Sequence, residues 1–202
     1  MDGWVDGWVG GWVGGWLENE FLKKTPSPKF GLESQLGTSD LEFVNLPQGL
    51  LRWREDFELS DNEICFAFKS AQSCSSLAAN KVFQYKILTQ ILPTRKYLAR
   101  FKVINSNRCE RCNIEVDSIM HCLWSCEAVH PYVERIIYYL ENECSVSASM
   151  LSEKAYIFGC PNKGVNHVFL ELKKEMFYNK DLISDLPTFC EYFFSKIRKI
   201  MS

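Results

Sequence analysis

The chain has no run of apolar residues near the roughly 18 that a helix needs to cross a bilayer. Its N-terminus also lacks the basic start and the apolar stretch of a secretory signal peptide. We therefore expect a cytoplasmic or nuclear protein that is not secreted and has no membrane partner. With 202 residues, 47% of them hydrophobic and 24% charged, the chain has enough apolar material to fold as about one domain.

A disulfide framework is also not expected. Nine cysteines are an odd number, and a chain without an export signal stays in a reducing compartment. Five of the cysteines are scattered and are interpreted as small apolar residues, buried or half-buried: Cys65, Cys74, Cys144, Cys160 and Cys190. The other four fall within eighteen positions, from Cys109 to Cys126.

The first part of the chain offers little for a core. Residues 1–17 are a low-complexity Gly/Trp repeat, DGWV-DGWV-GGWV-GGWL, which is too short for a solenoid. Its glycines each cost a helix about 1 kcal/mol relative to alanine, so we predict that this repeat is disordered. Residues 18–59 contain scattered proline, glycine and serine, which predicts a linker or a loosely packed arm.

Helical signals begin at Ser60 and predict a mainly α fold. Ser60 and Glu63 have the spacing of a capping box, and Thr94 can cap the helix that follows Pro93. Residues 60–145 are predicted to form a small helical domain and residues 146–202 a helical tail. The expected helices cover residues 60–71, 76–92, 94–102, 129–143, 166–179 and 187–200, the last with Thr188 as its cap.

The net charge of −2 conceals a basic segment in the middle of the chain. Residues 1–80 carry a net charge of −6, residues 81–112 carry +7, and residues 113–202 carry −3. A basic segment between acidic flanks is typical of a surface that contacts a phosphate backbone, and a solvated helix face is the alternative. The candidate phosphate contacts are Lys81, Lys86, Arg95, Lys96, Arg100, Lys102, Arg108 and Arg111. The candidates for stacking on unpaired bases are Tyr85, Tyr97, Phe101 and Trp124, and core packing is the alternative for the last three.

Four residues, Cys109, Cys112, His121 and Cys126, have metal-ligand spacing, C-x2-C-x8-H-x4-C. The first pair suits a tight turn whose backbone N–H groups point at the thiolates, and the second pair suits two ligands from one helical segment. Three thiolates and an imidazole favour tetrahedral Zn²⁺ with no open position for water. We therefore predict a structural zinc knuckle (Cys-Cys-His-Cys) that is not catalytic. Ordinary buried cysteines and a core histidine are the alternative.

Spacing alone does not decide which residue is the fourth ligand. In an ideal helix His121 and Cys126 lie about 140° apart, whereas Cys122 and Cys126 share a face. An all-cysteine site with Cys122 in place of His121 is therefore an alternative, and His130 is a weaker substitute. The longer imidazole and the four-residue gap, which zinc fingers also use, favour His121.

The stretch from Tyr85 to Cys126, YKILTQILPTRKYLARFKVINSNRCERCNIEVDSIMHCLWSC, resembles the zinc-binding region at the C-terminal end of LINE-type (non-LTR) retrotransposon reverse transcriptases. That family has a helix, a proline, a basic helix, C-x2-C, an acidic turn, a histidine followed by apolar residues, and a final cysteine. The resemblance implies His121 as ligand, because the next position is usually aliphatic in the family, a pattern from which Cys122 departs. A broader likeness covers about residues 51–202.

No paired-aspartate motif of a reverse-transcriptase palm and no endonuclease-like acidic cluster occur in the sequence, so we expect no enzymatic activity. The resemblance implies a non-catalytic fragment that binds nucleic acid, RNA or single-stranded DNA, and associates with reverse-transcriptase machinery. Two alternatives remain. One is a structural or protein-interaction module whose basic residues form only a solvated rim, and the other is a truncated element copy without a function of its own.

Overall fold

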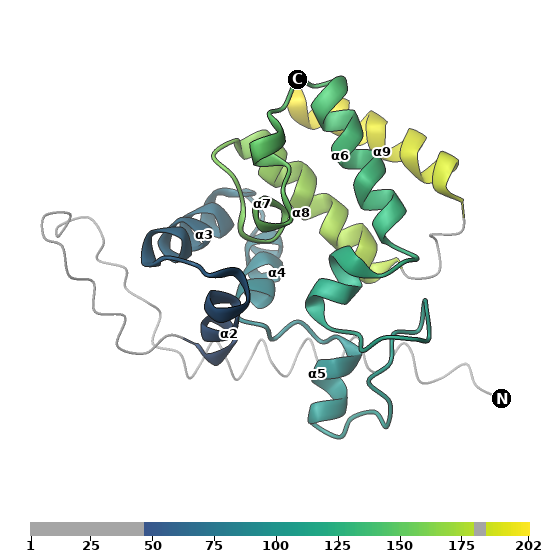
Figure 1. The fold of residues 1–202 in the computed structure, drawn as a ribbon. Coiled ribbons are helices and arrows are strands. Elements are labelled where there is room, and N and C mark those ends of the chain that lie inside the picture. The colour runs from purple at the N-terminus through teal and green to yellow at the C-terminus, as the bar shows by residue number, and fades with distance from the viewer. Residues whose placement is uncertain (1–46, 180–184) are drawn as a thin grey trace, which may run out of the picture. The chain divides into compact units, whose positions relative to one another are not determined.

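The structure is a computed structural model that describes residues 47–179 and 185–202. Most of these residues lie in helices (Figure 1). The helices are α2 (Gln48–Phe57), α3 (Asp61–Ser73), α4 (Ala78–Leu88), α5 (Arg95–Arg100), the π-helix η1 (His121–Ser125), α6 (His130–Asn142), the 3₁₀-helix η2 (Ala148–Met150), α7 (Glu153–Phe158), α8 (Lys163–Tyr178) and α9 (Leu186–Met201). The predicted mainly α fold is confirmed. Within these two ranges no helix has both the length and the apolar character needed to cross a membrane. The predictions for residues 1–46 lie outside the described residues.

Helix α2 lies in the last part of the predicted arm, residues 18–59, and corrects that prediction. Leu50 and Trp53 are buried in the core. The Trp53 indole N–H donates to the Ile87 carbonyl at 3.1 Å, which ties α2 to the end of α4. The spacing of Leu50, Trp53 and Phe57 is the helical signal in this segment, but no side-chain N-cap marks its start.

The ends of α3 and α4 illustrate one correct and one incorrect prediction. The capping box before α3 is confirmed, because the Ser60 N–H donates to the Glu63 carboxylate at 2.9 Å and the Glu63 N–H donates to Ser60 Oγ at 3.4 Å. Helix α4 ends at Leu88 and not at the predicted Leu92. Gln90 takes a left-handed conformation (φ 55°) and closes the helix one turn early.

The C-terminal helices pack into the same core as the preceding ones. Helix α3 packs on α4, α7 and α8, and α9 packs on both α6 and α8. Tyr156, Phe169 and Phe193, from α7, α8 and α9, are among the largest fully buried side chains of the described residues. The predicted tail, residues 146–202, therefore contributes directly to the core that supports the predicted domain.

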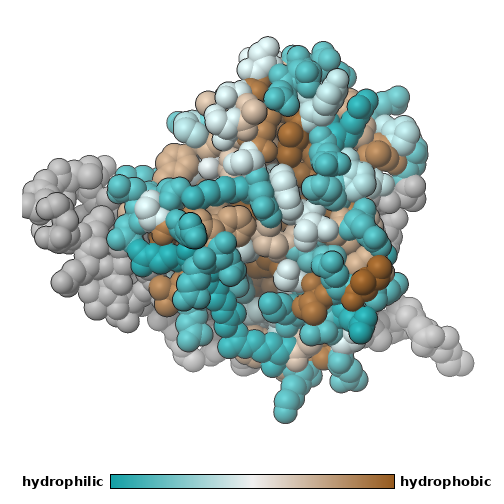
Figure 2. All heavy atoms as spheres, in the orientation of Figure 1, coloured by the Kyte–Doolittle hydropathy of each residue, from teal (hydrophilic) through white to brown (hydrophobic). Residues whose placement is uncertain are grey.

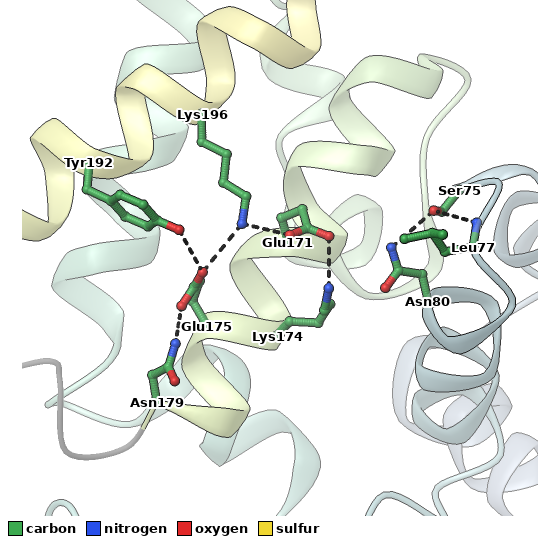
Figure 3. Close-up of polar contacts among 9 residues, drawn as sticks. All are labelled: Ser75, Leu77, Asn80, Glu171, Lys174, Glu175, Asn179, Tyr192 and Lys196. Atoms are coloured by element: carbon green, nitrogen blue, oxygen red, sulfur yellow. Dashed lines mark hydrogen bonds and ion pairs between the residues drawn. The ribbon is translucent and has the colours of Figure 1, made fainter.

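A polar network links α8 to α9 (Figure 3). Lys196 Nζ lies 2.7 Å from Glu171 and 3.4 Å from Glu175, and the Tyr192 hydroxyl donates to Glu175 at 3.4 Å. The Glu171 side chain is only 12% exposed, so solvent screens its pairing with Lys196 less than it screens a surface ion pair. The network fixes how α9 lies along α8.

Helix α9 begins before its predicted cap. Asp185 caps it by accepting the Thr188 N–H at 3.4 Å, so Thr188 is not the capping residue. Pro187 occupies the first turn, where its missing N–H breaks no helical hydrogen bond.

Candidate metal centre

The predicted metal ligands lie on two short segments. Cys109 and Cys112 are in a hairpin at residues 107–117, His121 begins the helix η1, and Cys126 directly follows that helix. The hairpin contains a single antiparallel bridge, and within it the Cys109 N–H donates to the Glu115 carbonyl at 2.8 Å. Asn113 has a left-handed conformation (φ 55°), which asparagine tolerates better than most residues. The chain therefore turns back immediately after Cys112.

This tight turn directs backbone N–H groups at the sulfur of Cys112, the arrangement that the C-x2-C spacing favours. Hydrogen bonds from the N–H groups of Glu115 and Ile114 stabilise the thiolate and lower the pKa of Cys112 to about 7. Burial instead raises the pKa of Cys126 to about 12. Of these two thiols Cys112 loses its proton more readily, and a cation must displace the proton from Cys126.

The π-helix η1 explains the five-residue spacing of the second ligand pair. Its hydrogen bonds join residues five apart, and the Cys126 N–H donates to the His121 carbonyl at 3.0 Å. This wider turn brings His121 and Cys126 over one another, whereas an ideal α-helix would separate them by about 140°. Both side chains can therefore reach the same point.

The ligand atoms of Cys109, Cys112, His121 and Cys126 all lie within 4.8 Å of one another. Cys109 Sγ is 3.8 Å from Cys126 Sγ, and Cys112 Sγ is 3.3 Å from His121 Nε2. In a tetrahedron with metal–sulfur bonds of about 2.3 Å, two sulfur atoms lie about 3.8 Å apart, and a sulfur lies about 3.6 Å from an imidazole nitrogen. The four side chains fit a tetrahedral cation.

The two alternatives for the fourth ligand lie outside this cluster. Cys122 is buried, its carbonyl accepts from Arg111 Nη1 at 3.1 Å, and the same nitrogen is 4.0 Å from its sulfur. His130 has other contacts, with its Nδ1 3.1 Å from the Trp124 carbonyl. The geometry therefore favours His121 over both.

Glu115 contacts His121 at the ring nitrogen that does not face the thiols. Its Oε2 lies 3.1 Å from His121 Nδ1, while Nε2 of the same ring faces Cys112. His121 Nδ1 is buried and makes no hydrogen bond of standard geometry among the described residues, so this carboxylate is its polar neighbour. A carboxylate at the outer nitrogen fixes the tautomer of a metal-ligating histidine and strengthens it as a ligand. The motif contains Glu115, but only the fold brings it to His121.

We expect Glu115→Ala to weaken Zn²⁺ binding about 10- to 100-fold, the usual effect of removing an outer partner of a ligand. Glu115→Gln keeps an acceptor oxygen for Nδ1 and should lose less. Competition with a chromogenic chelator measures both affinities. Glu110→Ala is the control, since Glu110 lies in the same hairpin but pairs with Arg95. An unchanged affinity in Glu115→Ala would show that the contact does not position the imidazole.

Helix α5, in the basic segment, is fixed to the hairpin at its N-terminal end. Asp117, which is buried, accepts the Arg95 N–H on its carboxylate at 2.9 Å and the Lys96 N–H on its carbonyl at 3.2 Å. Thr94 caps the helix by accepting the Tyr97 N–H at 3.4 Å, as predicted. The hairpin thus holds the basic helix beside the metal ligands.

The eight predicted phosphate contacts divide into two groups by exposure. Four are exposed: Lys96, Arg100, Lys102 and Arg108; four are half-buried: Lys81, Lys86, Arg95 and Arg111. Two of the half-buried cations bind other parts of the protein. Arg95 pairs with Glu110, and Arg111 donates to the carbonyls of Cys122 and Met176. Arg111 therefore connects the hairpin to η1 and α8, a structural role that its position in the sequence does not reveal.

Residues 61–131 match the family model described as zinc-binding in reverse transcriptase. This part of the chain is similar to a zinc-binding region associated with reverse transcriptases. The matched range includes the four clustered ligands and the eight basic residues, and the family model that it matches describes a zinc-binding region. No solved structure matches the chain.

Proposed function

We propose that this protein is a non-catalytic, zinc-stabilised module that binds nucleic acid, and that it corresponds to the C-terminal tail of a LINE-type reverse transcriptase. The observation that carries the proposal is the position of α5. Its exposed cations Lys96 and Arg100, with Lys102 just beyond the helix, project from a segment that the buried Asp117 fixes to the metal-binding hairpin.

Zinc is the cation that this ligand set favours. Three thiolates and one imidazole suit Zn²⁺, and their mutual distances match its tetrahedral geometry. Four protein ligands leave no position for a reactive water, so the role of the ion is structural. Such small sites contribute apparent binding free energies of roughly 10–16 kcal/mol to folding. The metal would hold the hairpin and η1 together and thereby position α5.

Nucleic acid is the partner that the charge distribution favours. Residues 81–112 carry a net charge of +7, although the whole chain carries −2. A nucleic acid binds favourably to such a local basic surface, because the Lys and Arg side chains that neutralise its phosphates release the counterions condensed on it. The exposed cations Lys96, Arg100 and Lys102 can approach a phosphate backbone from solvent more readily than the four half-buried ones. Arg108 is exposed as well, but its Nη1 also donates to the Ile114 carbonyl at 3.2 Å.

Charge reversal tests this surface. In the zinc-loaded protein, Lys96→Glu combined with Arg100→Glu and Lys102→Glu should abolish measurable RNA binding, because three phosphate contacts become repulsive. The matched control reverses three exposed cations on other helices: Arg52, Lys69 and Lys199. Fluorescence anisotropy at several salt concentrations gives the affinity and its salt dependence. Wild-type affinity that does not change with salt, or equal losses in both triple variants, would contradict a phosphate-binding role for α5.

A structural or protein-interaction module is the second candidate function. The internal contacts of Arg95 and Arg111 favour it, because these cations stabilise the fold instead of facing solvent. Under this function the zinc-loaded protein would bind neither RNA nor single-stranded DNA, and the triple reversal on α5 would leave association with reverse-transcriptase machinery intact.

A further inference from the structure

We propose that the nucleic acid is bound as a single strand, with an unpaired base stacked on the ring of Phe101 at the C-terminal end of α5. This inference rests on the proposed function and specifies its ligand. It assigns to Phe101 the contact with bases and to the neighbouring cations the contact with phosphates.

The structure distinguishes Phe101 from the other aromatic candidates. Trp124 is half-buried and packs on Tyr156, with ring centroids 5.2 Å apart. Tyr97 is half-buried, and Tyr85 is 36% exposed. Phe101 is 58% exposed, so a large part of its ring is open to a ligand. Around α5 and the hairpin, Figure 2 shows a mostly hydrophilic surface with separate hydrophobic areas.

The ring of Phe101 packs against the ring of Tyr97. Tyr97 lies one helical turn earlier, and the two ring centroids are 4.9 Å apart with a tilt of 48°. Because Tyr97 is itself partly buried against the protein, it limits the positions that the Phe101 ring can take. A ring that is held before binding loses little conformational entropy when a base stacks on it.

The backbone at this helix end is closed by two hydrogen bonds. The Lys102 N–H donates to the Ala99 carbonyl at 3.0 Å, and the Val103 N–H donates to the Leu98 carbonyl at 3.1 Å. This pattern is a Schellman motif, with Phe101 as its C-cap. The motif fixes the point from which the exposed ring projects.

Cations flank the ring on both sides in the sequence. The Arg100 guanidinium lies 5.9 Å from the centroid of the Phe101 ring. Lys102 has a left-handed conformation (φ 57°), at a position where glycine is the usual residue. Glycine would adopt this conformation with less strain, whereas the lysine adds an exposed positive charge to the turn. An aromatic face with adjacent Arg and Lys is the combination that binds a base and its phosphates in single strands.

A duplex does not fit this arrangement in the same way. The faces of paired bases are covered by their neighbours in the stack, and duplex RNA presents mainly phosphates and 2′-hydroxyls. A protruding phenyl ring therefore gains affinity from an unpaired base only. The cations can contact the phosphates of either form.

The test compares the zinc-loaded full chain on fluorescein-labelled oligo(U) and on duplex RNA of equal length. Phe101→Ala should weaken oligo(U) binding about 5- to 150-fold, the range for loss of one stacked base, and leave duplex binding unchanged. Phe101→Trp should retain oligo(U) binding. Tyr138→Ala is the matched control, because Tyr138 is 56% exposed with the Arg135 guanidinium 5.6 Å from its ring centroid, but lies on α6. Thermal melting confirms that each variant is folded.

A second measurement detects stacking directly. An oligonucleotide with 2-aminopurine loses fluorescence when its base stacks, and this quenching should be smaller in Phe101→Ala than in the wild type. Unchanged oligo(U) affinity in Phe101→Ala, with binding still abolished by the triple reversal on α5, would overturn base stacking and leave nucleic-acid binding supported. Absence of binding by the wild type to both RNA and single-stranded DNA would overturn both proposals and favour a protein as the partner of Phe101.

Discussion

Replacing His121 with alanine should abolish the binding of a zinc ion by the chain, whereas Cys122→Ala should leave the ion bound. His121 Nε2 faces Cys112 Sγ at 3.3 Å, and its removal leaves three sulfur ligands around an open fourth position. Structural zinc sites contribute roughly 10–16 kcal/mol, so loss of a ligand should have a large effect. Cys122→Ala removes a buried side chain outside the cluster and should cost only about 1 kcal/mol of stability. Native mass spectrometry of the reduced proteins counts the bound ion.

Loss of the ion should also reduce helical structure beyond the knuckle. Trp124 in η1 packs on Tyr156 of α7, and Arg111 in the hairpin donates to the Met176 carbonyl of α8. The far-ultraviolet circular dichroism signal should therefore fall in His121→Ala and in chelator-treated wild type, but not in Cys122→Ala. Retention of zinc by His121→Ala together with its loss from Cys122→Ala would place the fourth ligand at Cys122.

The sequence predicts helix boundaries best where a side chain caps the N-terminal end of the helix. Ser60 and Thr94 both accept the backbone N–H of the residue three positions further on, and both helices start where these residues predict. Helix α2 has no such cap and was missed, although Leu50 and Trp53 are spaced as on a helix. Helix ends that depend on tertiary packing, such as the left-handed turn at Gln90, are not visible in local patterns.

The metal centre shows the same division between local and non-local information. Ligand type and spacing are local, and they predicted the four residues whose side chains the fold brings together. The π-turn between His121 and Cys126 could not be predicted, because the α-helical period of 3.6 residues places them apart. The contact of Glu115 with His121 depends on the hairpin closing, so the sequence identifies the residue without its role.

The buried Lys173 is the clearest case of information that only the fold supplies. The helical pattern of α8 assigns Phe169, Leu172 and Met176 to the core and gives no reason to bury a lysine. Lys173 Nζ nevertheless donates to Gln84 Oε1 at 2.5 Å and to the Tyr156 carbonyl at 2.9 Å, joining α8 to α4 and α7. The Gln84 partner is 89 residues away in the chain.

Lys173→Met should change how the stability of the protein depends on pH. Burial lowers the pKa of Lys173 from 10.5 to about 7 in the folded protein. Between these values the unfolded chain binds a proton that the folded chain releases, so the free energy of unfolding of the wild type rises with pH by up to about 1.4 kcal/mol per unit. Below the pKa that Lys173 has in the folded protein, its amine is protonated in both the folded and the unfolded state. The folded protein then carries the full free-energy cost of a buried ammonium. Methionine removes this dependence while filling a similar volume.

The difference between wild type and variant isolates this effect from the other titrating groups. The free energy of unfolding of the wild type minus that of Lys173→Met should increase by about 2 kcal/mol from about pH 7 to about pH 9, as measured by urea denaturation with zinc and a reductant. The lost hydrogen bonds to Gln84 and Tyr156 add a constant offset and do not alter this slope. Lys174→Met is the control, because Lys174 is 30% exposed and pairs with Glu171 on the same helix. A flat difference for Lys173→Met would show that Lys173 keeps its proton in the core, held by its oxygen partners and by the Tyr156 ring 5.5 Å away.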